Sequence, residues 1–216
     1  MKHTKNTRIW EIVVQIRVGK ISISDTIPIS GRKLFYATNW KLDRRRINMD
    51  FYDVVKSRRS IRSYKSDAID REALGRICEA VRWAPSACNI QPWMFRIVLN
   101  REIRNNICSV YKGEWLKKAP GIVLALGNRD VAWKRVEGNS IIDVDIGIAM
   151  EHLILAAAAE GLSTCWICAF DVKKMGSVTG VLPPWEVLAI SPLGKAAQIP
   201  DAPKRKPSEE IFKIIE

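Results

Sequence analysis

The stretch Trp83–Phe95 reads W-A-P-S-A-C-N-I-Q-P-W-M-F, and the chain is organised around it. It follows a helix-like apolar pattern, which Pro85 ends because proline has no N–H and its ring clashes with the preceding turn. The amides of Asn89 and Gln91 argue against a strand core here. A loop that only reverses the chain does not need two prolines and two indoles. This composition suits a loop that presses its backbone and an amide against a flat polar ring. An ordinary surface loop above a tucked tryptophan is the other interpretation.

A second polar stretch lies upstream, where residues 57–64 read S-R-R-S-I-R-S-Y. It places the guanidiniums of Arg58, Arg59 and Arg62 beside the hydroxyl of Ser60. Guanidiniums match phosphate oxygens two at a time, and a hydroxyl adds a donor. The sequence contains neither G-x-G-x-x-G nor G-x-x-x-x-G-K-[ST], so side chains and helix ends must hold any cofactor phosphate. The stretch therefore predicts an anion site; a solvated basic helix end is the alternative.

Taken together, R-R-S-I-R followed by A-P-S-A-C-N-I-Q-P-W resembles the nitroreductase family of flavin enzymes. The resemblance runs from about Met49 to the C-terminus. It implies an α+β, nitroreductase-like fold with a central mixed or antiparallel sheet surrounded by helices. It also implies a homodimer that binds FMN at the interface between its subunits.

The same resemblance implies a role for each part of the cofactor site. Arg58, Ser60 and Arg205 are expected on the FMN phosphate, and Arg62 near the N1–C2 edge of the ring. Asn89 is expected at the ring edge, and a backbone N–H near Cys168 at flavin N5. The full set of expected cofactor-binding residues is Arg58, Arg59, Ser60, Arg62, Pro85, Ser86, Asn89, Gln91, Cys168, Ala169, Lys204 and Arg205. No side chain is expected to act as acid or base, and no metal is expected.

The implied function is electron transfer from NAD(P)H through FMN to a small acceptor such as a nitroaromatic or a quinone. The cofactor carries the chemistry, while the protein binds, orients and tunes it. Specialised chemistry of the same family is one alternative: flavin fragmentation, reductive dehalogenation or dehydrogenation. A flavin-binding or nucleic-acid-binding protein without turnover is another.

The charge distribution argues against nucleic acid as the main partner. The chain has 216 residues, 47% of them apolar, and a net charge of +12, which fits one globular domain. Residues 1–48 hold 11 basic and 3 acidic side chains, whereas the remainder holds 24 and 20. The excess therefore lies in an N-terminal extension, residues 1–48, and the domain proper is predicted over 49–216.

The five cysteines do not form a regular disulfide framework, and the polar start is unlike a signal peptide. A cytoplasmic setting is the expectation, and no stretch predicts a membrane span. Cys165 and Cys168 form a C-x-x-C motif, a pattern that zinc sites and redox dithiols use. The motif falls in an expected strand, where residues three apart face opposite sides, so a shared site is disfavoured. His152, on an apolar helix, is interpreted as a packed residue.

Hydrophobic periodicity and capping residues predict alternating helices and strands after the extension. Helices are expected over Phe51–Arg59, Asp70–Trp83, Arg101–Tyr111, Ile141–Gly161 and Val172–Val178. Strands are expected over Met94–Leu99, Ile122–Leu126, Ser163–Phe170 and Glu186–Pro192. The helix over Ile141–Gly161 is apolar nearly all round and carries four consecutive alanines, which predicts a subunit interface or burial within one subunit.

The extension itself contains two β-like runs, Ile9–Val18 and Ile21–Ile29, separated by Gly19-Lys20, so a hairpin is possible there. The following stretch, Asn39–Asn48, is basic. An accessory extension is the favoured interpretation, and an arm for nucleic acid or an anionic membrane is the alternative. Because the resemblance also begins at Met49, the true start codon is hypothesised to lie at that residue.

Overall fold

The computed structural model describes residues 14–16 and 50–216, and its centre is a five-stranded sheet. The strands lie in the order β1-β2-β3-β5-β4, and every pairing between them is antiparallel. Their bounds are β1 Val14–Ile16, β2 Trp93–Val98, β3 Gly121–Asn128, β4 Ser163–Thr164 and β5 Trp185–Gly194. The predicted α+β class and central sheet are therefore confirmed.

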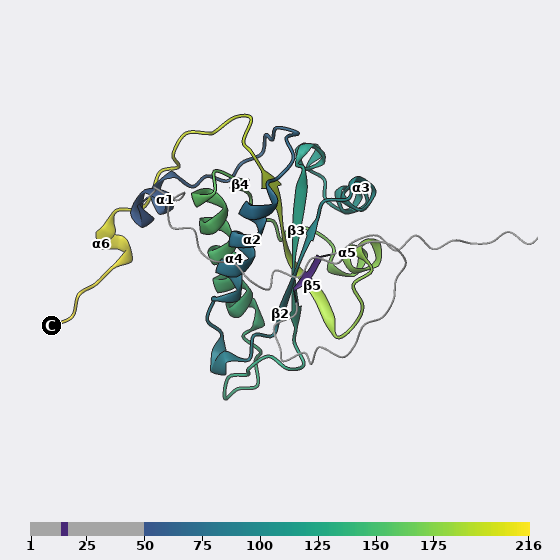
Figure 1. The fold of residues 1–216 in the computed structure, drawn as a ribbon. Coiled ribbons are helices and arrows are strands. Elements are labelled where there is room, and N and C mark those ends of the chain that lie inside the picture. Colours follow the sequence, from purple (N-terminus) through teal and green to yellow (C-terminus); the bar gives the residue numbers. More distant parts are fainter. Residues whose placement is uncertain (1–13, 17–49) are drawn as a thin grey trace, which may run out of the picture.

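Helices cover both faces of this sheet (Figure 1). On one face lie α2 (Arg71–Arg82) and α4 (Ile142–Ala159), with α1 (Phe51–Ser57) against α4. On the other lie α3 (Arg101–Val110) and α5 (Val172–Thr179). Every residue of β3 is buried, because the central strand packs against helices on both sides. The remaining elements are the short helices η1 Ala87–Asn89, η2 Glu114–Lys118 and α6 Ser208–Ile211.

Capping residues explain why several predicted helix bounds agree with the structure. The Asp70 carboxylate accepts the N–H of Glu72 at 3.3 Å at the start of α2. Asp171 accepts the N–H of Lys174 at 2.9 Å at the start of α5. That helix ends at Gly180, whose φ of 63° is the left-handed conformation that glycine adopts without strain.

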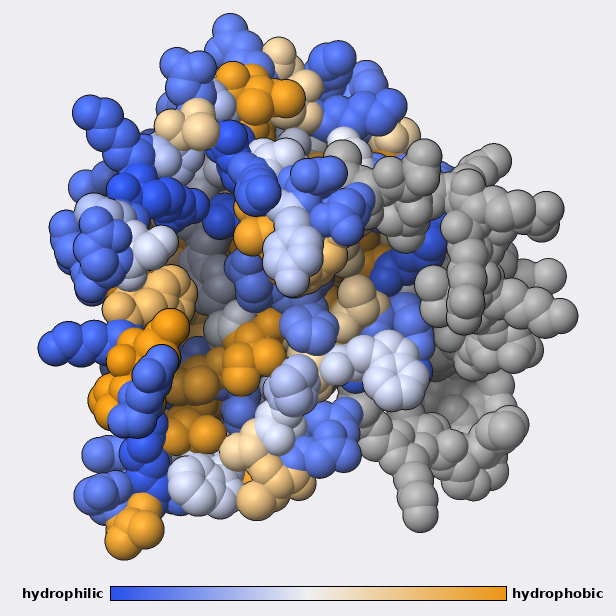
Figure 2. All heavy atoms as spheres, turned by 90° about the vertical axis from the view of Figure 1, so that its left-hand side faces the viewer, coloured by the Kyte–Doolittle hydropathy of each residue, from blue (hydrophilic) through white to orange (hydrophobic). Residues whose placement is uncertain are grey.

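The longest helix, α4, divides its apolar residues between two surfaces. Met150, Leu153 and Ala157 are fully or almost fully buried inside the subunit. Val144 is 51% exposed, and Leu155 is half-buried. The helix thus presents an apolar stripe outward, which the chain itself does not cover. Figure 2 shows apolar side chains gathered on the face of the molecule that carries α1 and α4.

One predicted strand is wrong in extent. Ser163–Phe170 was expected as a continuous strand, but β4 comprises only Ser163 and Thr164. The ladder stops because the N–H of Cys165 donates to the side-chain Oγ of Ser191 at 3.3 Å, not to a backbone carbonyl. Ile167 then makes a single bridge to Ile190.

The first helix, α1, leaves most of its apolar side chains exposed. Only Val54 of α1 is buried, whereas Phe51 is 61% and Val55 is 44% exposed. None of the described residues covers these side chains. The helix is nonetheless where it was expected, and it ends two residues earlier than predicted.

Part of the N-terminal extension belongs to the described structure. In β1, Val14 pairs with Ile97 and Ile16 with Phe95 of β2, which adds an edge strand to the sheet. The second run of the proposed hairpin and the basic stretch Asn39–Asn48 lie outside the described residues. The domain start at Met49 stays a prediction. None of the helices in the described part is long and apolar enough to cross a membrane.

Candidate cofactor site

The arginine cluster, Arg58, Arg59 and Arg62, directly follows α1. Its backbone lies between two other segments of the chain. The N–H of Arg58 closes α1 by donating to the carbonyl of Val54 at 3.0 Å. The N–H of Ile61 then donates to the carbonyl of Thr164 at 2.9 Å. On its other side, Ser63 accepts the N–H of Ala197 at 2.8 Å. Backbone hydrogen bonds therefore fix the segment that carries Ser60 and Arg62.

A hollow of about 430 Å³ opens beside this segment. It is lined by Ser60, Arg62, Ser63, Gln198, Ile199 and Pro200. The lining thus combines the sequence-predicted hydroxyl and guanidinium with residues from the start of the C-terminal arm. Both Ser60 and Arg62 are exposed to this hollow, so a ligand can reach them.

The positive charge of the cluster is not neutralised within the described residues. The Nη1 of Arg59 donates to the backbone carbonyls of Lys56 at 2.6 Å and of Arg58 at 2.9 Å. No described carboxylate pairs with Arg58 or Arg62. Guanidiniums without a carboxylate partner beside a hydroxyl form a site suited to a phosphate group.

Beneath the cluster lie two buried groups that the sequence analysis did not place there. Burial raises the pKa of the Cys165 thiol, against the lowering effects of the nearby Arg62 guanidinium and Ser60 hydroxyl. Burial also raises the pKa of Tyr64 well above its usual range, and its hydroxyl donates to the carbonyl of Ile61 at 2.8 Å. Both groups are therefore neutral at physiological pH, and the positive charge of the cluster stays uncompensated.

The segment after β4 presents free backbone donors. Cys168 and Ala169 are exposed, and no described residue accepts a hydrogen bond from the N–H of either. The indole Nε1 of Trp166 donates to the Sγ of Cys168 at 2.8 Å. Cys165 is buried and Cys168 is exposed. Neither lies in β4, so the strand that was expected to turn their side chains to opposite sides does not contain them.

The organising loop, the part of the stretch Trp83–Phe95 that precedes β2, has an unusual backbone. Cys88, Asn89 and Gln91 have φ values of 48°, 52° and 53°, which are uncommon for residues other than glycine. The N–H of Gln91 donates to the Oγ of Ser86 at 2.9 Å. The Nε2 of Gln91 donates to the Oδ1 of Asn89 at 2.8 Å. These contacts hold the loop in one shape, in which Pro85, Cys88 and Asn89 are exposed.

Within one chain, the loop and the arginine cluster lie at opposite ends of α4. The N–H of Ala87 donates to Asp145 in the first turn of the helix, at 3.1 Å. Ser60 bridges to Thr164, which follows the other end of the helix. An 18-residue helix is about 27 Å long. The structure therefore does not bring the two sequence motifs together in a single subunit.

The C-terminal basic pair lies on an arm that leaves the body of the molecule (Figure 1). Lys204 and Arg205 are exposed, and neither has a described partner. Their role at a phosphate remains a prediction, although the arm begins with residues that line the hollow.

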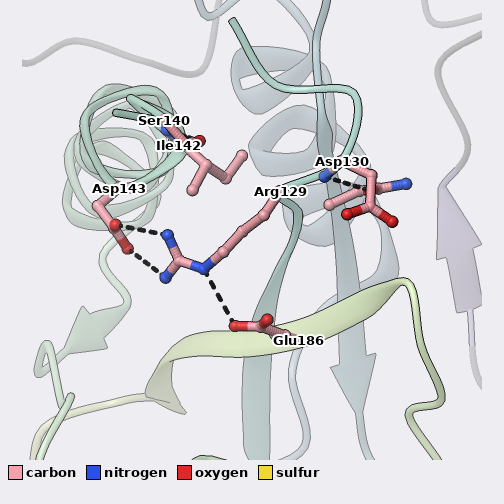
Figure 3. A network of polar contacts seen from close by, with 7 residues as sticks. Arg129, Asp130, Ser140, Ile142, Asp143 and Glu186 are labelled. Carbon is pink, nitrogen blue, oxygen red and sulfur yellow. Dashed lines mark hydrogen bonds and ion pairs between the residues drawn. The ribbon is translucent and has the colours of Figure 1, made fainter. Parts of the chain in front are cut away.

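Sequence reasoning missed several residues that shape this region. Asp145 lies in a pattern that predicts a helix, and its partner Ala87 belongs to a distant part of the chain. Trp166 lies in the expected strand, and its partner Cys168 is a near neighbour in the sequence. Another missed contact set ties the first turn of α4 to the sheet (Figure 3). Arg129 binds Asp143 through two hydrogen bonds of 2.9 and 3.2 Å and Glu186 through one of 3.2 Å.

Comparison with known proteins agrees with this fold. The model of the Nitroreductase family matches residues 55–136 and 109–195. A Methanothermobacter thermautotrophicus protein, provisionally named NADH dehydrogenase/NAD(P)H nitroreductase, is 29% identical over 160 residues, covering 70% of this chain and 80% of that protein. An iodotyrosine deiodinase from Thermotoga neapolitana is 25% identical, with 74% and 95% covered.

Solved structures give the same result. A nitroreductase family protein from Clostridium difficile 630 has a TM-score of 0.71 and 27% identity, covering 76% of this chain and 98% of that one. An FMN-dependent nitroreductase from Clostridium difficile R20291 has a TM-score of 0.62 and 28% identity, with 70% and 90% covered. Since the family model matches well over half of the sequence, this chain belongs to the nitroreductase family.

Proposed function

We propose that this protein is an FMN-dependent oxidoreductase that passes electrons from NAD(P)H to a small acceptor such as a nitroaromatic or a quinone. The observation that carries the proposal is the unneutralised Arg62 guanidinium and the Ser60 hydroxyl at the hollow, in a chain of the nitroreductase family. A similar protein is named as an NADH dehydrogenase/NAD(P)H nitroreductase, and another as FMN-dependent. When bound, FMN supplies the hydride and electron chemistry.

The residues at the hollow, with Arg58 nearby in the sequence, suit a dianionic phosphate. Arg58 and Arg62 offer charge-assisted donors, and Ser60 offers a hydroxyl without added charge. In this proposal the exposed N–H of Cys168 or Ala169 donates to the flavin ring, and this does not depend on their side chains. Arg62 would sit near the ring edge on which negative charge develops, where a fixed cation is stabilising. The Arg59 guanidinium donates to two backbone carbonyls. In this proposal it therefore stabilises the backbone of the arginine cluster.

The separation of the two motifs supports a homodimer as the functional form. The loop with Ser86, Asn89 and Gln91 contacts one end of α4, while the arginine cluster lies past the other end. In a pairing through the outward stripe of α4 about a two-fold axis perpendicular to the helix, the two copies of α4 run antiparallel. Each loop then meets the arginine cluster of the partner, and both motifs reach one cofactor. The exposed C-terminal arm is also suited to reach a second subunit, where Lys204 and Arg205 could add positive charge at a phosphate.

The absorption spectrum of the purified protein tests the cofactor directly. We expect flavin bands, release of FMN on denaturation, and re-binding of added FMN by the apoprotein. NADH and NADPH oxidation should then depend on bound FMN and on an added nitroaromatic or quinone. A purified protein that neither carries flavin nor binds added FMN would overturn the proposal.

Reductive dehalogenation is a second candidate, because one similar protein is named as an iodotyrosine deiodinase. The same assay can include iodotyrosine beside the nitroaromatic acceptor. Iodide release coupled to reductant consumption, at a higher kcat/KM than nitro reduction, would favour this second activity.

A further inference from the structure

Asp145 is a buried acid directly behind the organising loop. Its side chain belongs to the first turn of α4 and is 1% exposed. Its Oδ1 accepts the N–H of Ala87 at 3.1 Å, whereas its Oδ2 is buried without a partner among the described residues. A carboxylate in such a place is costly to desolvate. The positive end of the α4 dipole offsets part of that cost.

The loop that Asp145 contacts is otherwise bonded mainly to itself. Ser86 accepts from Gln91, Gln91 donates to Asn89, and the N–H of Ile90 donates to the carbonyl of Ala87. Asp145 is the one hydrogen-bonding partner outside the loop that the described structure gives to residues 85–91. Left-handed backbone at non-glycine residues persists only where the surroundings hold it. The Ala87–Asp145 bond is thus the described hydrogen bond that holds this strained loop to the rest of the protein.

We propose that Asp145 is a positioning residue of the flavin site. By holding Ala87, it fixes the backbone in which Ser86, Asn89 and Gln91 reach the cofactor. It touches neither the cofactor nor the acceptor. This inference rests on the proposed function, because it assigns the loop to an FMN site.

Four variants separate this role from simple core stability. Asp145→Ala removes the acceptor, and Asp145→Asn keeps an oxygen for Ala87 while removing the charge. Asp143→Ala is the matched control, because Asp143 lies in the same turn but faces Arg129 on the exposed side. Ala87→Pro removes the same hydrogen bond from the loop side. Proline is tolerated there because Ser86 already has the extended backbone (φ −141°, ψ 162°) that residues before proline favour.

Two measurements are needed, and the first does not require flavin. Amide hydrogen exchange of the apoprotein should rise about tenfold or more at Asn89 and Ile90 in Asp145→Ala. The dissociation constant of FMN should rise about ten- to a hundredfold, as expected for the loss of a bond to a charged group. Asp145→Asn should retain most of the slow loop exchange and most of the FMN affinity of the wild type. Asp143→Ala should change neither quantity. The double variant Ala87→Pro/Asp145→Ala should be no worse than the poorer single variant, because both remove one bond.

The outcomes that contradict the inference are distinct from those that contradict the proposed function. Unchanged loop exchange in Asp145→Ala shows that Asp145 does not hold the loop. Faster exchange with unchanged FMN affinity shows that the loop is not part of the flavin site, although the protein remains a flavoprotein. Wild-type protein that binds no FMN overturns both the proposed function and the flavin role of Asp145. Amide exchange in the loop then still shows whether Asp145 holds Ala87. If Asp145→Ala does not fold, Ala87→Pro and Asp145→Asn decide between these results.

Discussion

At the scale of single residues, Glu79 joins two neighbours at the end of α2. Its carboxylate accepts two hydrogen bonds from Arg82, at 2.8 and 2.5 Å, and one from the Trp83 indole at 2.7 Å. The Arg82 guanidinium also lies 4.8 Å from the centre of the Trp83 ring. The bond from Arg82 is the main reason why the pKa of Glu79 is lowered. This cluster fixes the residue from which the organising loop departs.

This cluster gives a pH-dependent prediction. Because the folded pKa lies below the unfolded value, the contribution of Glu79 is present above the unfolded pKa and is lost as pH falls through the folded pKa. We expect Glu79→Gln to lower the free energy of unfolding at pH 7 by about 0.5 kcal/mol. The difference from wild type should shrink below about pH 4, where wild-type Glu79 is also protonated. Urea denaturation at both pH values measures it, with Glu137→Gln on an exposed turn as the control. A difference that stays constant with pH would assign the effect to helix propensity.

The arginine cluster gives a second prediction at this scale. Arg58→Ala or Arg205→Ala should weaken FMN binding about ten- to a hundredfold, since each charge-assisted contact is worth roughly 1.5–3 kcal/mol. The melting temperature of the apoprotein should change little, because neither side chain has a described carboxylate partner. Arg101→Ala, at the start of α3, is the control. FMN titration followed by flavin fluorescence measures the effect, and equal affinity in both variants would remove the phosphate role.

At the scale of elements, α4 is held at both ends by ion pairs. Arg129 ties its first turn to β5 through Asp143 and Glu186 (Figure 3). At its last turn, Arg76 of α2 forks onto Glu160 with hydrogen bonds of 2.6 and 2.7 Å. The second pair is the less exposed, so it is screened less by solvent and salt. The Arg76–Glu160 pair is therefore the stronger of the two ties, and the Asp143 pair contributes little.

The predictability of these elements follows from where their signals lie. The sequence predicts the bounds of α2 well, because Asp70 caps its start and Pro85 follows its end. The strand over Ser163–Phe170 was too long because its end is set by the Ser191 hydroxyl, a partner on another strand. The arginine cluster was readable as contiguous charge in the sequence. Asp145 was not, because an acid in the first turn of a helix normally indicates solvent exposure and dipole stabilisation.

The outward stripe of α4 gives a prediction about the dimer. Leu155→Glu should convert a dimer to a folded monomer with reduced flavin content, since the half-buried leucine faces outward. Ala157 lies in the alanine run of the same helix. That residue is 0% exposed within its own subunit, so Ala157→Glu should unfold the protein. Leu182→Glu, 73% exposed, is the matched control and should change neither property. Light scattering with flavin absorbance measures both, and a dimeric Leu155→Glu protein would place the interface elsewhere.

At the scale of the whole molecule, the extension adds an edge strand to a sheet that is otherwise formed by residues after Met49. Only three residues of it, β1, are hydrogen-bonded to β2 in the described structure. An edge strand leaves one side of its partner exposed when it is removed, and water can replace the lost backbone hydrogen bonds. Within the described part of the chain, both hydrophobic clusters beside the sheet consist of residues after Met49.

We therefore expect a chain that begins at Met49 to fold, dimerise and retain flavin. The structural effect of removing the extension should be confined to β2, the strand that pairs with β1. Amide exchange should rise at Phe95 and Ile97, which pair with Ile16 and Val14, and should stay slow in β3, which keeps neighbours on both sides. Exchange measured by mass spectrometry, beside light scattering and flavin content, tests this. An insoluble or flavin-free truncated protein, beside a full chain that binds flavin, would show that the extension is part of the folding unit, because the edge of β2 would then need β1 for the whole sheet to form.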